Sequence, residues 1–258
     1  VDGREYDLTS QQYVNYAKNG QEYLQRFIFN SVPQYIYQVE DINIKKTIAM
    51  EYGHNTVVVC YEVTNGSRPA KLNIVPLFNF RPAGATTERN ELKFTRELRG
   101  NVLKLIPEAK RDITISFFTS EGVYKDRALR PTSMATPNYL IEENHYYEFD
   151  NRNGALSLDN HFTPYDIELD LAPRERKLFY IKCTVEELDD RNGFEIVEEY
   201  MNRAIHLMMQ SGYSNSFALN LVKAADHFIV DRRSTGLKTI LAGFPWFTDW
   251  GRDTMIAF

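Results

Sequence analysis

The densest group of chemically active side chains in the sequence lies near its carboxy end, between Leu241 and Thr254. Both tryptophans of the chain fall in this segment, together with two carboxylates and one guanidinium: Trp246, Asp249, Trp250, Arg252 and Asp253. Aromatic rings stack on the apolar faces of a pyranose, while adjacent guanidinium and carboxylate groups donate to and accept from its hydroxyls. These residue types therefore favour a neutral sugar as the ligand.

Each of these residues also has a structural explanation. Asp253 stands before an apolar helical run, where it would serve as the N-cap. Trp246 and Phe247 would then be core aromatics, and Arg252 would be the ion-pair partner of Asp249. We favour the binding role because all of these types occur together on one loop that enters a helix, and loops held by rigid elements concentrate functional groups. Gly251 would give that loop the backbone freedom to bring its neighbours into a common space.

Other chemistries find little support. The five histidines are scattered, without the paired spacing of a zinc site, and the glycine-rich patterns of nucleotide binding and of serine nucleophiles are absent. We therefore expect no metal and no cofactor.

Composition limits the class of protein. The chain has 258 residues, 43% of them hydrophobic and 25% charged, which is enough for a large domain with its own core. Its net charge of −5 argues against a nucleic-acid partner. No apolar run approaches the roughly 20 residues of a membrane span, so no membrane contact is expected. Cys60 and Cys183 sit apart in alternating apolar runs, which fits a reducing, cytoplasmic location.

Up to about residue 190 the hydrophobic pattern has the period of β-strands. The expected strands cover 26–29, 34–39, 42–50, 55–63, 70–80, 101–106, 113–119, 146–149, 165–171 and 177–184. Because no helical pattern intervenes, they predict an antiparallel β-sandwich. Asn65-Gly66 predicts a tight hairpin that joins 55–63 to 70–80.

The period becomes helical after Gly193. One amphipathic helix is expected up to Gly212, and a second follows through Ala218 and Ile229, with Ser214 or Ser216 as its N-cap. The predicted domains are a β-sandwich at 1–192, a linker helix at 193–213, and the start of a further domain at 214–258. Residues 254–258 resemble the first turn of a helix, so we expect the sequence to be a fragment.

The segments LVKAADHFIVDRR and GFPWFTDWGRDTMIAF resemble the opening of the catalytic domain of bacterial and archaeal glycogen debranching enzymes of the amylo-α-1,6-glucosidase type. More loosely, REYDLTSQQY, GHNTVVVCYEV and LNIVPLFNFR are similar to the sandwich that precedes it. The resemblance implies a mainly β architecture: an antiparallel sandwich (supersandwich), a linker helix, and the truncated start of an (α/α)6 barrel.

The same resemblance implies inverting hydrolysis of α-1,6-linked glucose in glycogen or a branched α-glucan. Trp246, Asp249, Trp250 and Arg252 would bind the sugar, and Asp253 would hold a glucose hydroxyl or donate the proton. Inverting hydrolysis needs a second carboxylate, roughly 6.5–9.5 Å from the acid. We expect that group in the missing C-terminal barrel domain, a partner without which this chain is inactive.

Two alternatives remain at this stage. The first is a non-catalytic β-sandwich that binds glucans through its aromatic residues, which make up 13% of the chain. The same residues are common in ordinary β cores. The second is a sugar phosphorylase of similar layout, which would need a phosphate-binding element beyond residue 258.

Overall fold

The computed structural model describes residues 1–129, 140–232, 234–244 and 247–257. They form two compact units, Val1–Val197 and Glu198–Phe258. The mainly β, antiparallel fold expected from the sequence is confirmed. The start of an (α/α)6 barrel and the domain boundaries at 192 and 213 stay predictions.

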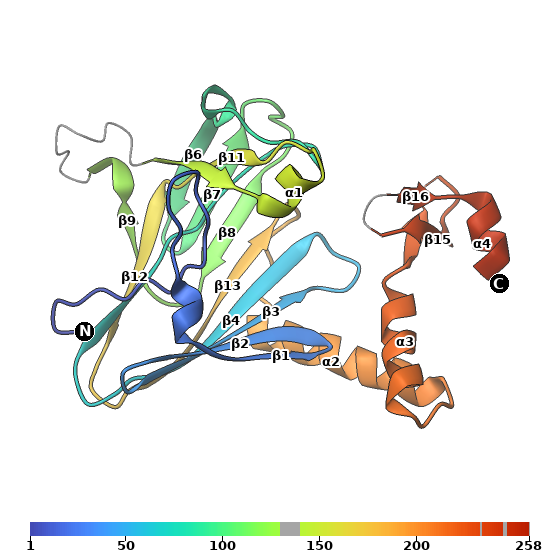
Figure 1. The fold of residues 1–258 in the computed structure, drawn as a ribbon, viewed down its shortest axis with the longest axis horizontal. Helices are drawn as coiled ribbons and strands as arrows, with labels where there is room; N and C mark the ends of the chain where they lie inside the picture. The colour runs from blue at the N-terminus through green and yellow to red at the C-terminus, as the bar shows by residue number, and fades with distance from the viewer. Residues whose placement is uncertain (130–139, 233, 245–246, 258) are drawn as a thin grey trace. The chain divides into compact units, whose positions relative to one another are not determined.

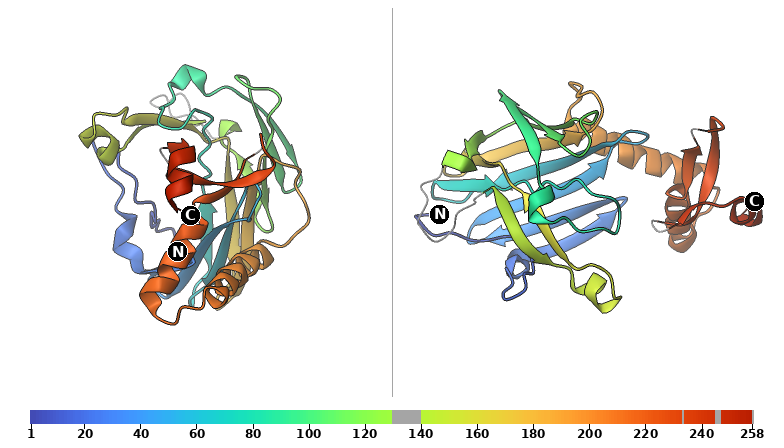
Figure 2. Two further views of the ribbon diagram at one scale, coloured as in Figure 1. Left: turned by 90° about the vertical axis from the view of Figure 1, so that its right-hand side faces the viewer. Right: turned by 90° about the horizontal axis from the view of Figure 1, so that it is seen from above.

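The first unit is built on an eight-stranded antiparallel sheet with the order β1-β2-β3-β4-β13-β8-β7-β6 (Figure 1). In that order the strands are Leu24–Asn30, Val32–Val39, Ile42–Met50, Thr56–Thr64, Arg176–Thr184, Ile115–Thr119, Val102–Pro107 and Phe94–Arg99. β-Branched and aromatic residues dominate them, as expected for half-buried pleated strands. Figure 2 shows the sheet from two further sides.

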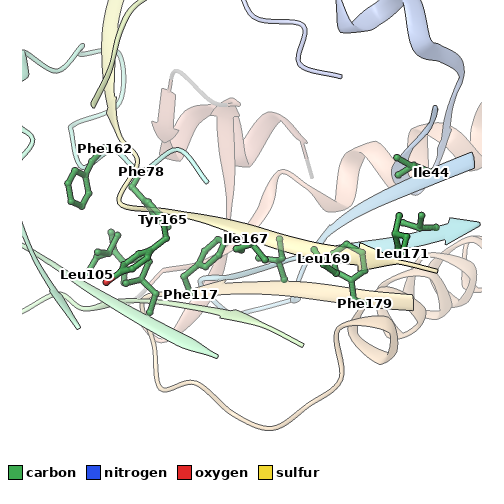
Figure 3. Packing of buried hydrophobic residues seen from close by; sticks show 14 of the residues in the cluster. Ile44, Phe78, Leu105, Phe117, Phe162, Tyr165, Ile167, Leu169, Leu171 and Phe179 are labelled. Atoms are coloured by element: carbon green, nitrogen blue, oxygen red, sulfur yellow. The ribbon is translucent and has the colours of Figure 1, made fainter. Parts of the chain in front are cut away.

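A three-stranded sheet covers part of one face of the large sheet. It has the order β5-β12-β9, with bounds Ala70–Ile74, Tyr165–Leu171 and Val123–Asp126. Ile167, Leu169 and Leu171 alternate along β12 and meet residues of the large sheet, including Phe117 and Phe179 (Figure 3). Fully burying one such side chain stabilises the fold by about 1.5–3 kcal/mol. This core, between the two sheets, holds the first unit together.

The prediction of a tight hairpin at Asn65-Gly66 is wrong. β4 lies between β3 and β13, whereas β5 belongs to the other sheet, so the chain crosses between layers here. Buried Asn65 donates its amide to the carbonyl groups of Leu171 and Ala172, at 3.2 and 2.7 Å. Tertiary hydrogen bonds of this side chain, rather than a local turn, therefore direct the crossing.

The prediction of a strand at 146–149 is also wrong. β10 (Ile141–Tyr146) ends there, and a short helix, α1 (Glu148–Arg152), leads to β11 (Leu158–Phe162), which pairs with β10. Glu148 and Asp150 lie in the first turn of α1, and Arg152 pairs with Glu148 one turn away. Both arrangements favour a helix. Three short 3₁₀ turns complete the unit: η1 (Gly20–Tyr23), η2 (Arg89–Glu91) and η3 (Arg127–Leu129).

Two helices begin the second unit. α2 (Gly193–Gln210) starts in the first unit and continues into the second, and α3 (Ser216–Asp226) follows it. Asn215, not the expected serines, is the N-cap of α3 and accepts from the Ala218 backbone N–H at 2.8 Å. Arg203 on α2 forms an ion pair with Asp226 at the end of α3.

A small antiparallel sheet follows in place of the expected continuation of the second helix through Ile229. Its order is β14-β15-β16, with bounds Ile229–Arg232, Leu237–Gly243 and Phe247–Asp249. Gly236, with φ of +67°, donates its N–H to the Arg232 carbonyl at 2.9 Å, which closes the β14–β15 turn. The last element is α4 (Gly251–Ala257). No helix within the described residues is long and apolar enough to cross a membrane.

Candidate functional site

The segment singled out in the sequence folds as a strand followed by a helix. β16 pairs with β15 through Leu241 opposite Asp249 and Gly243 opposite Phe247. α4 begins two residues after β16 ends, and the Thr254 N–H donates to the Trp250 carbonyl at 2.9 Å. Thr254 Oγ1 also donates to the Ile240 carbonyl of β15 at 3.4 Å. The small sheet thus positions the first turn of α4.

Asp249 is anchored to the sheet by one of its two oxygens. Its Oδ2 atom accepts from Thr239 Oγ1 at 3.3 Å and lies 3.4 Å from Arg232 Nε. The ion-pair partner considered from the sequence was Arg252, but the structure places Arg232 there. Among the described residues, no hydrogen bond to Asp249 Oδ1 is found. That oxygen can therefore accept from a ligand hydroxyl while Oδ2 holds the strand.

Trp250 lies directly before α4, and Arg252 and Asp253 lie in the first turn of the helix. Trp250 is 55% exposed, Arg252 is exposed, and Asp253 is half-buried. Since the helix begins at Gly251, Asp253 is its third residue and not the expected N-cap. In the described part of the chain, Arg252 has no carboxylate within ion-pair distance. The indole and the guanidinium are therefore free to meet a ligand, and the helix dipole favours the carboxylate in this turn.

Three further residues of this segment were singled out in the sequence. Trp246 lies outside the described residues. Gly251 has an ordinary φ, and an added Cβ would meet nothing within 4 Å, so the protein itself does not require glycine there. Phe247 is 59% exposed and not a core residue.

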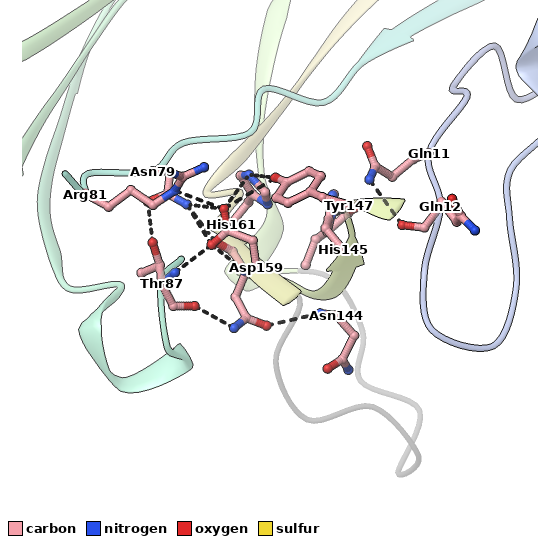
Figure 4. A network of polar contacts seen from close by, with 12 residues as sticks. Gln11, Gln12, Asn79, Arg81, Thr87, Asn144, His145, Tyr147, Asp159 and His161 are labelled. Carbon is pink, nitrogen blue, oxygen red and sulfur yellow. Dashed lines mark hydrogen bonds and ion pairs between the residues drawn. The ribbon is translucent and has the colours of Figure 1, made fainter. Parts of the chain in front are cut away.

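A second polar cluster, which the sequence did not indicate, surrounds fully buried Asp159 on β11 (Figure 4). Its Oδ1 accepts from the backbone N–H of Thr87 at 2.7 Å, and its Oδ2 accepts from Arg81 Nε at 3.1 Å. Asn79 Nδ2 lies 3.2 and 3.1 Å from the two oxygens. Burial raises the pKa of Asp159, but hydrogen bonds from the backbone N–H groups of Thr87 and Asn160, together with the charges of Arg81 and His161, lower it overall. The cluster fixes the loop 79–87 onto β11.

Two histidines, His145 and His161, lie beside this cluster, and His161 Nε2 is 3.8 Å from Asp159 Oδ2. The rings of His145 and His161 lie 4.4 Å apart between centroids. His145 Nε2 donates to Glu142 Oε2 at 3.3 Å, and the Tyr13 hydroxyl donates to the same oxygen at 2.9 Å. The hydrogen bond from His145 lowers the pKa of Glu142 to about 2. Within the described residues, no three His, Cys, Asp or Glu side chains are arranged to hold a metal ion.

Cavities are found elsewhere. One of about 470 Å³ lies in the first unit, and charged, hydroxyl and aliphatic side chains from 97–104, 114–116 and 186–188 line it. Another, of about 400 Å³, adjoins η2 and Ile141. Neither cavity has an aromatic side chain in its lining, so both match the candidate sugar chemistry less well than the start of α4.

Comparison with protein families gives two matches. Residues 1–178 match the family described as glycogen debranching enzyme N terminal, and residues 223–258 match the amylo-alpha-1,6-glucosidase family. The second match contains β14, β15, β16 and α4, and with them the candidate site. No curated protein matches the chain at a significant level.

Two solved structures resemble the chain weakly. A polysaccharide lyase has 12% sequence identity and a TM-score of 0.32, over 64% of this chain and 23% of that one. A protein named as a kojibiose phosphorylase from human microbiome has 13% identity and a TM-score of 0.32, over 76% of this chain and 23% of that one. The chain thus spans less than a quarter of the length of either structure.

Proposed function

The chain belongs to the glycogen debranching enzyme N-terminal family, and on that premise we propose that it is part of a glycoside hydrolase that removes α-1,6-linked glucose at branch points of glycogen-like glucans. The second family match, over the segment that carries the candidate site, supports the same activity. We place the whole protein in the cytoplasm. Its proposed partner is a glycogen-like glucan, which it binds as substrate.

The observation that carries the proposal is the open turn at the start of α4. Trp250 presents a solvent-exposed indole, and Arg252 and Asp253 follow it on the first helical turn. We assign Trp250 to stacking on the terminal glucose, and Arg252 and Asp253 to its hydroxyls. Asp249, through Oδ1, is the further polar contact, and Trp246 is proposed to line the same subsite.

Inverting hydrolysis needs a general acid and a general base on opposite sides of the scissile bond. Of the two carboxylates in this segment, Asp249 is engaged by Arg232 and Thr239, which leaves Asp253 as the candidate acid. The described residues offer no second free carboxylate beside it in this segment. We therefore propose that this chain binds sugar without hydrolysing it, and that an α/α-barrel domain supplies the general base.

Isothermal titration of the 258-residue chain with isomaltose tests this assignment. Arg252→Gln and Asp253→Asn should each lower the affinity at least fivefold without changing the melting temperature. Arg152→Gln, which removes an exposed guanidinium on α1, is the matched control and should bind as the wild type does. Equal affinity in all four proteins would refute the site, and release of glucose from a branched dextrin by this chain would refute its inactivity.

A further inference from the structure

A row of directly paired residues crosses five neighbouring strands of the large sheet, from β13 in the core to β1 at the edge. The register pairs are Phe179 with Tyr61, Tyr61 with Lys46, Lys46 with Tyr35, and Tyr35 with Phe27. These residues share the sheet face that carries the core, because register partners lie on one face. The row begins at fully buried Phe179 on β13 and ends on the edge strand β1, where Phe27 is 52% exposed.

The end of this row is an aromatic strip, which we define as Phe27, Phe29 and Tyr35. Phe29 lies two residues beyond Phe27, so it shares the same face, and it is 63% exposed. The rings of Phe27 and Tyr35 are 5.0 Å apart between centroids, in a tilted arrangement. β1 and β2, which carry the strip, form one edge of the large sheet (Figure 1).

The second layer does not reach this part of the sheet face. Along β3, Ile42 and Ile44 are buried in the core, whereas Met50 at the other end is 57% exposed. Two aromatic rings and a methionine side chain thus remain in contact with water on a face whose other half is a hydrophobic core. Exposed apolar surface of this kind commonly marks a binding site.

Lys46 shows what chemistry an occupant must have. Its ammonium lies over the Tyr35 ring, 5.0 Å from the centroid, and burial lowers its pKa. Within the described residues Lys46 has no carboxylate at ion-pair distance, unlike its neighbour Lys45, which pairs with Glu62 on the opposite face. A purely apolar partner would leave the ammonium without an acceptor, which is costly. An occupant with flat apolar faces and many oxygen acceptors satisfies both the rings and the ammonium.

We propose that the aromatic strip and Lys46 form a second saccharide-binding surface, separate from the start of α4, that holds a neutral α-glucan chain by stacking. The identity of the glucan rests on the proposed function, whereas the stacking surface rests on the exposed rings alone. The exposed rings of Phe27 and Phe29 would contact successive sugar units, Tyr35 would support Phe27 from the side, and Lys46 would donate to a ring or hydroxyl oxygen. Such a surface would keep a long, branched substrate attached to the protein.

Titration of the 258-residue chain with maltoheptaose tests the surface. Phe27→Ala and Phe29→Ala should each weaken binding roughly 2- to 12-fold, the range expected for one lost aromatic stacking contact. Phe149→Ala is the matched control, because this phenylalanine is 72% exposed and lies on α1 in the same unit. Lys46→Met should also weaken binding, and Lys46→Arg should restore part of it. In the wild-type protein, the backbone amide NMR signals of residues 25–36 should shift on titration, which tests the surface even if a variant fails to fold.

A Trp250→Ala background separates this surface from the proposed catalytic site. Binding that survives Trp250→Ala and is lost on adding Phe27→Ala supports the strip, even if isomaltose fails to bind near α4. Binding that is lost with Trp250→Ala and unaffected by Phe27→Ala overturns the strip and leaves the proposed function intact. Self-association that Phe27→Ala abolishes, with unchanged maltoheptaose affinity, would identify the strip as a contact between two copies and overturn the proposal.

Discussion

Lys182 donates from its ammonium to Asp189 Oδ1 at 2.5 Å, which ties β13 to the segment that leads into α2. The same ammonium donates to the carbonyl groups of Arg191 and Asp189, at 2.6 and 3.3 Å. Lys182 is almost fully buried, whereas the Asp189 side chain is about half exposed. The pair is therefore asymmetric: only one of its members depends on the other for charge compensation.

This asymmetry predicts unequal effects of removing the two partners. Asp189→Ala leaves a buried ammonium without its anion and should cost about 3 kcal/mol of unfolding free energy or more. Lys182→Met leaves a carboxylate that water can reach, and should cost less than about 2 kcal/mol. Urea unfolding of both variants measures the difference. A larger loss for Lys182→Met would contradict the assignment.

Gly251→Ala separates folding from ligand binding at the start of α4. The Cβ meets no protein atom within 4 Å and the φ angle is ordinary, so alanine should stabilise the helix by about 0.5–1 kcal/mol. If the sugar approaches the backbone between Trp250 and Arg252, the same methyl group should lower isomaltose affinity severalfold. Thermal unfolding and titration of one variant check both effects. A destabilised variant would contradict the open surroundings of this residue.

The histidine pair predicts that the first unit loses stability in acid. Burial and the nearby His145 lower the pKa of His161, so its protonation favours the unfolded chain as the pH falls below about 6.5. Arg81 adds to the positive charge, while Glu142 and Asp159 oppose it. The pKa of Glu142 is about 2 in the folded state, below its ordinary value of 4.5, so its contribution is present above pH 4.5 and is lost between 4.5 and 2.

Urea unfolding of the wild type, His161→Gln and Glu142→Gln at pH 7.5, 5.5 and 3.5 tests both groups. The wild type should lose stability at each step. His161→Gln should flatten the change between pH 7.5 and 5.5, and Glu142→Gln should flatten the change between 5.5 and 3.5. Unchanged slopes in both variants would show that other groups govern the acid response.

The thiols predict slow chemistry in the folded state. Burial raises the pKa of Cys60 to about 12 and that of Cys183 to about 11. Because the thiolate is the nucleophile, both should react with a disulfide reagent at pH 8 much more slowly than a free cysteine. In urea both should react at the ordinary rate. Rapid labelling of the folded protein would show that one of these strands opens readily.

Local patterns were sufficient to predict much of the fold. β3 and β12 have the predicted bounds, because apolar residues recur at every second position along part of each strand, as Ile42 and Ile44 do in β3 and Ile167, Leu169 and Leu171 do in β12. The crossing at Asn65 could not be predicted, since its amide bonds to carbonyl groups more than 100 residues further along the chain. A local turn signal cannot show such a long-range contact.

The candidate site, too, was predicted only in part: its residue types could be read from the sequence, but its tertiary contacts could not. The residue types of Trp250, Arg252 and Asp253 are visible in the sequence, but the partner of Asp249 is not. Arg232 reaches Asp249 because β14 and β16 both pair with β15, and these short strands begin at Ile229, where the predicted helical period ends. Runs of three to seven residues give too weak a period to predict a strand from the sequence alone.

The Arg232–Asp249 pair predicts a small contribution to stability and a larger one to binding. The Arg232 side chain is about half exposed, and such pairs contribute about 0.2–1 kcal/mol, which salt screens. A double-mutant cycle of Arg232→Gln and Asp249→Asn in urea unfolding should give a coupling in that range, lower in 1 M NaCl. Arg232→Gln should nevertheless weaken isomaltose binding severalfold, since Asp249 Oδ1 would lose its fixed position beside Trp250. Unchanged affinity in Arg232→Gln, with full loss in Arg252→Gln, would show that Asp249 serves the sheet and not the sugar.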